Sequence, residues 1–200
     1  MDIQVKKGKN MQFLIVNAGC THFGHGGTLS AAMVEKARET LEKLGHTVEE
    51  TRLENGWNNA EEAQKILRAD VVIIQTPGWW MSTPWQLKKY EDDVFVDPIL
   101  CGGDGRSRKD PQKKYGSGGK LTSKRYLLSS TWNAPLEAFT DPNQFFEGKG
   151  IDGLFMPLHK TFEFLGMKPC ESFMVNDVFK HPTIEADMKR WEAHLMKLFG

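Results

Sequence analysis

Three tryptophans, Trp79, Trp80 and Trp85, stand within a short stretch that also contains Gly, Ser and Pro and therefore reads as a loop. Indole faces stack on flat aromatic molecules, and such a partner would offset the cost of exposing them. Gly78, directly before the pair, would let the backbone approach a planar ligand closely. We therefore predict a site for a flat ring here. The competing interpretation is that these side chains cover the core or an oligomer interface.

A second segment, residues 19–30, is rich in glycine and hydroxyl groups and leads into a helical pattern. Backbone N–H groups at the start of a helix, together with the helix dipole, bind anions such as phosphate. The glycines do not complete GxGxxG, because Leu29 occupies the third position, and no GK[ST] of a Walker A loop occurs. On its own, the segment is compatible with phosphate binding or with an ordinary flexible loop.

A third segment, from Thr131 through Trp132 and Asn133 to Ala134, follows an apolar run and supplies an aromatic ring, an amide and backbone N–H groups. Such donors can bind the ring oxygens and nitrogens of a flavin and stabilise the negative charge that reduction places near N1. Alone, the segment would be an ordinary turn. A phosphate cradle beside two loops for a flat ring, however, describes a site for a flavin nucleotide.

The elements that must position these loops alternate along the chain. Apolar runs at residues 11–16, 71–76 and 125–132 predict buried strands, and residues 47–53 and 170–176 predict an edge strand and a final strand. Helical spacing follows each strand: from Leu29 to Leu44, from Asn58 or Asn59 to Arg68, from the cap Thr83 and Pro84 to Phe95, over residues 157–165, and from Ile184 to Leu198. Residues 96–120 are predicted as a long loop, which in a compact domain is usually functional or disordered.

Alternating strands and helices predict an α/β fold with a five-stranded parallel sheet and helices on both faces. Five strands favour the flavodoxin-like order 2-1-3-4-5, in which ligands bind beyond the carboxyl ends of the strands. The three loops described above follow predicted strands 1, 3 and 4, so we expect them to meet at that edge.

Composition narrows the class of protein further. The 200 residues suit one domain, which we place at residues 11–200 behind a flexible tail of residues 1–10. Lys plus Arg and Asp plus Glu both number 26, so the basic excess of a nucleic-acid binder is missing. The sequence has no apolar run that could span a membrane. Three cysteines far apart, with no metal-ligand spacing, favour a reducing cytoplasm and predict no metal site.

The chain from about Met11 to Gly200 resembles the NAD(P)H quinone reductases of the modulator of drug activity B type. The resemblance rests on segments that are long and specific: residues 77–81 (PGWWM), 84–85 (PW), 88–90 (KKY), 92–95 (DDVF), 104–106 (DGR), 108–111 (RKDP), 113–119 (KKYGSGG) and 131–135 (TWNAP).

The resemblance implies a flavodoxin-like homodimer that binds FAD and uses NADPH to reduce quinones by two electrons, a reaction that protects against quinone and oxidative stress. It also implies which residues contact the cofactor: His25, Gly26, Gly27, Thr28, Leu29, Ser30, Ala31, Ala32, Gly78, Trp79, Trp80, Met81, Tyr115, Thr131, Trp132, Asn133 and Ala134.

The reaction expected from this resemblance is ping-pong, with NADPH and then the quinone occupying the same place over the flavin. A proton donor near the quinone oxygen would assist it. Tyr115 is the candidate, with His159 behind it, although a lone histidine in an amphipathic helix is more often a packing or surface residue. The basic residues between Arg106 and Lys114 either form a solvated loop or bind phosphate of FAD or NADPH.

Three alternatives stay open at this point. The first is an FMN-dependent azoreductase or nitroreductase. The second is a flavodoxin-fold binding module without turnover, although the acidic residues of a phospho-receiver are missing after the first strand. The third is a hydrolase, which the missing nucleophile motif disfavours.

Overall fold

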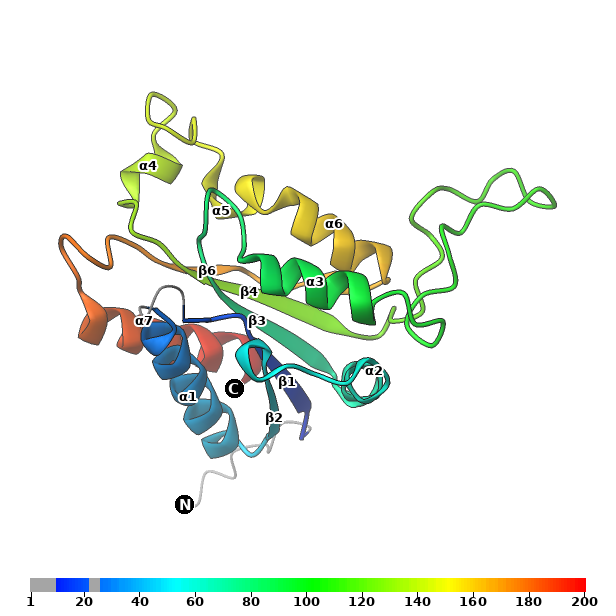
Figure 1. Cartoon of the computed structure of the whole chain (residues 1–200), viewed down its shortest axis with the longest axis horizontal. Helices are drawn as coiled ribbons and strands as arrows, with labels where there is room; N and C mark the ends of the chain where they lie inside the picture. Colours follow the sequence, from blue (N-terminus) through cyan, green and yellow to red (C-terminus); the bar gives the residue numbers. More distant parts are fainter. Residues whose placement is uncertain (1–9, 22–25) are drawn as a thin grey trace, which may run out of the picture.

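A computed structural model of the chain describes residues 10–21 and 26–200. The predicted tail, residues 1–10, lies outside this part except for its last residue. Figure 1 shows a parallel sheet between two layers of helices. Its strands are β1 (Gln12–Asn17), β2 (Thr47–Arg52), β3 (Val71–Pro77), β4 (Arg125–Thr131), β5 (Lys168–Pro169) and β6 (Phe173–Val175). The order β2-β1-β3-β4-β5, with β6 also paired to β4, confirms the predicted flavodoxin-like arrangement.

The two helical layers follow from the alternation of side chains along buried strands. Phe13 and Ile15 of β1 face one core, which is covered by α1 (Thr28–Lys43) and α7 (Ile184–Phe199). Leu14 and Val16 face the other core. That core is covered by α2 (Asn59–Arg68), α3 (Trp85–Val94) and α6 (Met156–Phe164), with the short η1 (Leu53–Asn55), α4 (Glu137–Thr140) and α5 (Gly150–Leu154) at its margin.

The last strand differs from the prediction because it is broken in two. Pro169 pairs with Tyr126 and Phe173 pairs with Ser129, so four steps along the edge oppose three steps along β4. The extra residue disrupts the ladder as a bulge does. The sheet therefore has a sixth strand where one continuous strand, residues 170–176, was expected.

The start of α3 also differs slightly from the prediction. Pro84 occupies the cap position and Trp85 is the first helical residue, whereas Thr83 was predicted as the cap. The predicted cap of α2 is confirmed, because the Asn58 side chain accepts a hydrogen bond from the backbone N–H of Glu61.

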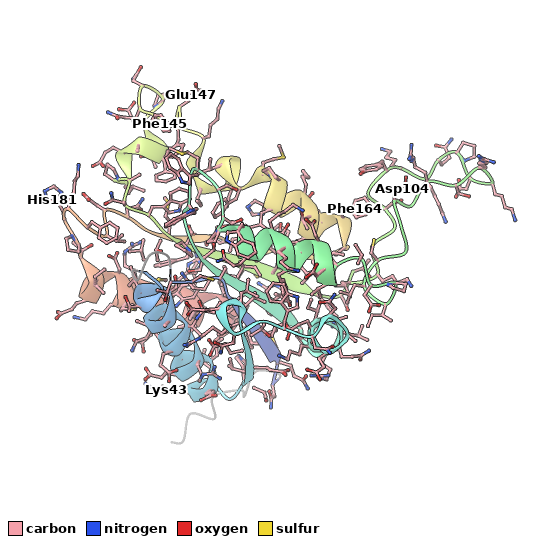
Figure 2. All side chains as sticks on the ribbon, in the orientation of Figure 1. Lys43, Asp104, Phe145, Glu147, Phe164 and His181 are labelled. Atoms are coloured by element: carbon pink, nitrogen blue, oxygen red, sulfur yellow. The ribbon has the colours of Figure 1, made fainter. Side chains whose placement is uncertain are left out.

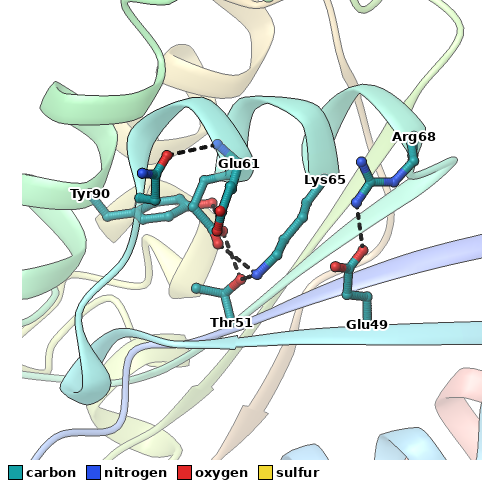
Figure 3. Close-up of polar contacts among 8 residues, drawn as sticks. Glu49, Thr51, Glu61, Lys65, Arg68 and Tyr90 are labelled. Carbon is teal, nitrogen blue, oxygen red and sulfur yellow. Dashed lines mark hydrogen bonds and ion pairs between the residues drawn. The ribbon is translucent and has the colours of Figure 1, made fainter.

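A buried carboxylate joins α2 to its neighbours (Figure 3). Glu62 is only 2% exposed. Its Oε2 accepts hydrogen bonds from Thr51 of β2 at 2.7 Å and Tyr90 of α3 at 2.9 Å, and its Oε1 lies 2.7 Å from Lys65 Nζ. Each carboxylate oxygen is thus satisfied, and the three elements are held in fixed relation.

Residues 101–119 form an arm that leaves the body between α3 and β4 (Figure 1). Its two ends are joined by the bridge between Cys101 and Gly119, and Leu121 N–H donates to the Leu165 carbonyl just behind it. The arm leaves near the amino ends of the strands, whereas the β3–α3 loop lies at their carboxyl ends. Among the described residues, no helix is long and apolar enough to cross a membrane.

Candidate functional site

The carboxyl edge of the sheet brings the three predicted loops together. β1 pairs with β3 and β3 with β4, so the segments that follow these strands begin side by side. Two hydrogen bonds continue the ladder past the strand ends: Ala18 N–H to the Gln75 carbonyl and Gly78 N–H to the Thr131 carbonyl, each 2.8 Å long. The convergence expected from topology is therefore present in the backbone.

The β3–α3 loop is a tight hairpin turn with two residues at its tip. Trp79 and Ser82 exchange both backbone hydrogen bonds, and Trp80 and Met81 between them have φ angles of 48° and 59°. A turn with two consecutive left-handed residues normally contains Asn and Gly, because other side chains are strained there. The turn keeps Trp80 86% exposed. Strain together with an exposed indole is typical of a ligand-binding segment rather than of a structural turn.

The start of α1 provides the second part of the site. Gly26 and Gly27 have φ angles of 104° and 81°, and a side chain on Gly26 would press against the Cys20 carbonyl. No side chain of the described residues caps this helix, which makes its first backbone N–H groups candidate donors to an anion. Ser30, by contrast, is buried with its side chain packed against Gly19. His25 lies outside the described residues.

The β4 loop contributes backbone rather than an aromatic face. Trp132 is 6% exposed, and its indole packs among Phe139, Phe146 and Phe155. A Cβ on Gly78 would lie 2.3 Å from the Trp132 ring, so this glycine makes room for the protein's own tryptophan. The structure thus places the Trp132 side chain beneath the site. Asn133 and the Ala134 backbone remain at the rim.

Tyr115 is not brought to the carboxyl edge of its own chain. It lies at the base of the arm, 70% exposed, with its ring 5.4 Å from that of Phe164 at the end of α6. Figure 2 shows Phe164 and Asp104 on the arm side of the molecule. Arg106 pairs with Asp104 and lies over the Tyr115 ring, so this part of the predicted basic loop is engaged within the arm.

His159 bridges three elements of the core. Its Nδ1 lies 2.7 Å from the Tyr126 hydroxyl on β4, and its Nε2 lies 3.1 Å from Asp152 on α5. The hydrogen bond from His159 holds the pKa of the Asp152 carboxyl below its usual range. A neutral ring that accepts from Tyr126 and donates to Asp152 satisfies both contacts. The structure therefore places His159 away from the carboxyl edge of the sheet, where it links α6 to β4 and α5.

Sequence reasoning missed a groove at the other end of α3. The hollow has a volume of about 860 Å³ and lies between α3, α6 and the base of the arm. Glu91 forms part of its floor and is 8% exposed. The sequence did contain a signal for a buried acid at this place. Glu91 stands four residues after Leu87 and three before Val94, on the apolar stripe of the helix. Among the described residues, no group of His, Cys, Asp or Glu has the geometry to hold a metal ion.

Comparison with known proteins identifies a family and several relatives of this chain. The flavodoxin-like fold family matches residues 11–195. NADPH:quinone oxidoreductase MdaB of Haemophilus influenzae is 45% identical over 193 residues, which cover 95% of this chain and 100% of that protein. The uncharacterized protein C5H10.05c of Schizosaccharomyces pombe is 46% identical over 193 residues, which cover 95% and 98% of the two chains.

A solved structure agrees at the level of fold. The NAD(P)H:quinone oxidoreductase from Methanothermobacter marburgensis superposes with a TM-score of 0.69 at 18% identity, covering 94% of this chain and 99% of that one. The strand order, the loops at the carboxyl edge and the full-length match lead to one conclusion. The chain belongs to the flavodoxin-like fold family, in the group that contains the quinone oxidoreductase MdaB.

Proposed function

We propose that the protein is an NADPH-dependent quinone oxidoreductase that works through a flavin, with FAD as the expected form and FMN as the alternative. The observation that carries this proposal is the strained turn at Trp80 and Met81 beside the uncapped start of α1. One feature offers a face for a flat ring and the other offers donors for phosphate. Both lie at the point of the sheet where this fold binds nucleotides.

The residues present fit a flavin nucleotide. The N–H groups of Thr28, Leu29 and Ser30 would hold phosphate, since a helix start without a side-chain cap has free donors. The turn from Gly78 to Met81 would cover one face of the ring. A bound flavin would supply a centre that accepts hydride from NADPH and gives it to a quinone.

The chain itself would orient the flavin and the substrates and would exclude water from the site. Thr131 is buried beside Gly78, and the backbone around Asn133 would meet the polar edge of the ring. NADPH and quinone would bind in turn over the same face of the ring, as in a ping-pong reaction. The equal numbers of acidic and basic residues, 26 of each, fit a small-molecule enzyme in the cytoplasm.

We further propose that the active unit is a homodimer built on the layer of α3 and α6. Both helices begin at the carboxyl edge and end near the arm, and both ends carry exposed apolar side chains. Trp85 and Met156 mark the start of the layer, and Val96 and Tyr115 mark its end. A two-fold axis through the middle of the layer would place the start of one copy against the end of the other. Tyr115 would then contact the flavin of the partner.

The first experiment is to purify the protein, record its visible spectrum, and add NADPH without air and then menadione. We expect a flavin spectrum that bleaches with NADPH and returns with menadione, and chromatography of the released cofactor distinguishes FAD from FMN. A colourless protein that neither takes up flavin nor oxidises NADPH would contradict the proposal.

The role of the turn is tested with Trp80→Ala, which should release flavin at least tenfold more readily. Trp191→Phe is the control, because that indole on α7 is buried against α1 and its loss removes one tryptophan outside the site. If both variants retained flavin equally, the stacking role of Trp80 would be wrong.

The dimer is tested by mixing two variants that are each expected to be impaired, Trp80→Ala and Tyr115→Ala. If the two residues serve the same site from different copies, a mixed dimer contains one intact site and one doubly altered site, so activity returns on mixing. If both residues serve a site within one chain, no intact site can form and activity stays low.

A further inference from the structure

The groove at the end of α3 combines apolar walls with one buried acid. Phe95 and Leu165 form its floor together with Glu91, and Val96 and Phe164 stand at its sides. Tyr115 lines the same hollow from the base of the arm. A volume of about 860 Å³ is within the range of small-molecule pockets, and apolar walls with few polar groups suit a flat, weakly polar molecule.

Glu91 differs from other acids around it because its carboxyl has no partner among the residues that the structure describes. It is 8% exposed, and within residues 10–21 and 26–200 nothing donates a hydrogen bond to it or pairs with it. Its neighbours are already engaged: Lys88 pairs with Asp92, and Lys160 pairs with Glu163. The charged and titratable groups that face the groove from α3, the arm and α6 are Lys88, Asp92, Cys101, Tyr115, Lys160 and Glu163.

Burial raises the pKa of Glu91 to about 7, an effect that Lys88 opposes and Asp92 reinforces. The group is therefore mostly protonated below pH 7 and mostly ionised above it. An unpartnered neutral carboxyl that opens into an apolar groove is suited to donate a hydrogen bond or a proton to a bound oxygen atom.

We propose that Glu91 is a catalytic proton donor to the quinone, in an active site that the groove completes on the partner subunit. This inference rests on the proposed flavin enzyme and on its dimer, because Tyr115 and Glu91 line one groove and both would face the carboxyl edge of the second copy. Glu91 reaches the site from the buried floor, whereas Tyr115 reaches it from the exposed wall.

The step balances in atoms and electrons. The quinone receives one hydride, which derives from NADPH and carries both electrons, and one proton from the Glu91 carboxyl. The O–H bond of Glu91 breaks, a new O–H bond forms on the quinone oxygen, and hydroquinone leaves. The Glu91 carboxylate then regains a proton from water through the open groove.

Glu91→Gln tests the proposal because it keeps the size of the side chain and removes the acid. The reduced enzyme is mixed rapidly with menadione, which needs a proton, or with ferricyanide, which accepts electrons without one. We expect reoxidation by menadione to slow about 100-fold, while reoxidation by ferricyanide, flavin content and reduction by NADPH stay within twofold of wild type. Asp93→Asn is the matched control, since this acid of the same helix pairs with Lys89 and lies outside the groove.

The pH dependence provides a second criterion. Menadione reoxidation by wild type should fall as the pH rises through about 7, and Glu91→Gln should lose that limb. Infrared titration of the protein without turnover should show one carboxyl band that disappears near this pH in wild type and is missing in the variant. Glu91→Ile, which fills the space with an apolar side chain, should repeat the kinetic result.

The outcomes separate the two proposals. Equal rates with menadione for wild type and Glu91→Gln would overturn the proton-donor role, and so would an equal slowing with both acceptors or the lack of the infrared band. A wild-type protein without flavin or without a reaction with NADPH would instead contradict the proposed function itself.

Discussion

Two buried glutamates lie on either side of α3 and differ in how their charge is accommodated. Glu62 reaches α3 from α2 and is bonded by Thr51, Lys65 and Tyr90. Glu91, the residue after Tyr90, lines the groove, and its carboxyl has no partner among the described residues. Two adjacent residues of α3 therefore differ: Tyr90 completes the polar cluster around Glu62, whereas Glu91 is itself a buried acid without a donor among the described residues.

The difference shows which buried acid stabilises the folded state and which one lowers its stability. A buried carboxylate with donors on both oxygens can remain ionised at modest cost, whereas an unpartnered one must bind a proton or destabilise the fold. The turn at Trp80 and Met81 belongs with Glu91 in this respect, because its backbone is strained. The strained turn lies before the first residue of α3, whereas Glu91 directly follows Tyr90 of the satisfied cluster along the helix.

The strongest test of the comparison is to remove the satisfied acid. Glu62→Leu leaves the Lys65 ammonium without its partner, and it leaves the hydroxyls of Thr51 and Tyr90 without an acceptor. We expect a loss of about 3–5 kcal/mol in the free energy of unfolding, measured with urea. Glu61→Gln, an exposed acid beside it, should change stability by less than ~0.5 kcal/mol. A small loss for Glu62→Leu would mean that the cluster contributes little to stability.

The unsatisfied acid should respond in the opposite direction. In the folded state the pKa of Glu91 is about 7, against an ordinary value of 4.5, so folded protein holds a proton that unfolded protein releases between these pH values. Wild-type stability therefore falls as the pH rises from 4.5 to 7, and this loss is complete above 7. Glu91→Ile should be more stable than wild type by roughly 2–3 kcal/mol at pH 8, with a much smaller gain at pH 5.

Urea unfolding of both proteins at the two pH values measures this difference. Glu163→Gln, whose acid is paired with Lys160, provides the control and should show no such pH-dependent gain. A gain for Glu91→Ile that is equal at pH 5 and pH 8 would indicate improved packing alone and would remove the ionisation argument.

The turn at Trp80 and Met81 provides a further test of the difference between stabilising and destabilising features. Replacing Trp80 with Asn and Met81 with Gly supplies the residues that a turn with two left-handed positions prefers. We expect the protein without flavin to gain about 2 kcal/mol in stability, while flavin is retained less well. Calorimetry and flavin content report the two effects separately. A variant that gained stability and still retained flavin fully would show that the strain has no connection with the ligand.

Much of this architecture could be predicted, because the signals are local. The runs before Asn17 and Pro77 are apolar on both faces, and alternation with helices then favours the strand order that the structure shows. The burial of Trp132 against Gly78 could not be predicted, because it depends on contact between two separate loops. The position of Tyr115 follows from the alternation itself, because a loop between a helix and the next strand of a parallel sheet lies at the amino ends of the strands.

The smallest expected effect concerns one donor of the satisfied cluster. Tyr90→Phe removes the hydroxyl that lies 2.9 Å from Glu62 but leaves Thr51 and Lys65 in place, so the carboxylate keeps two donors. We expect a loss of about 1 kcal/mol in urea unfolding, the ordinary net value of one hydrogen bond. Glu91 is the next residue along the helix, but its carboxyl lines the groove and does not contact Glu62. Its infrared band should therefore be unchanged in this variant. If the band moved, the two acids would be coupled through α3, and the contrast between them would describe one system instead of two.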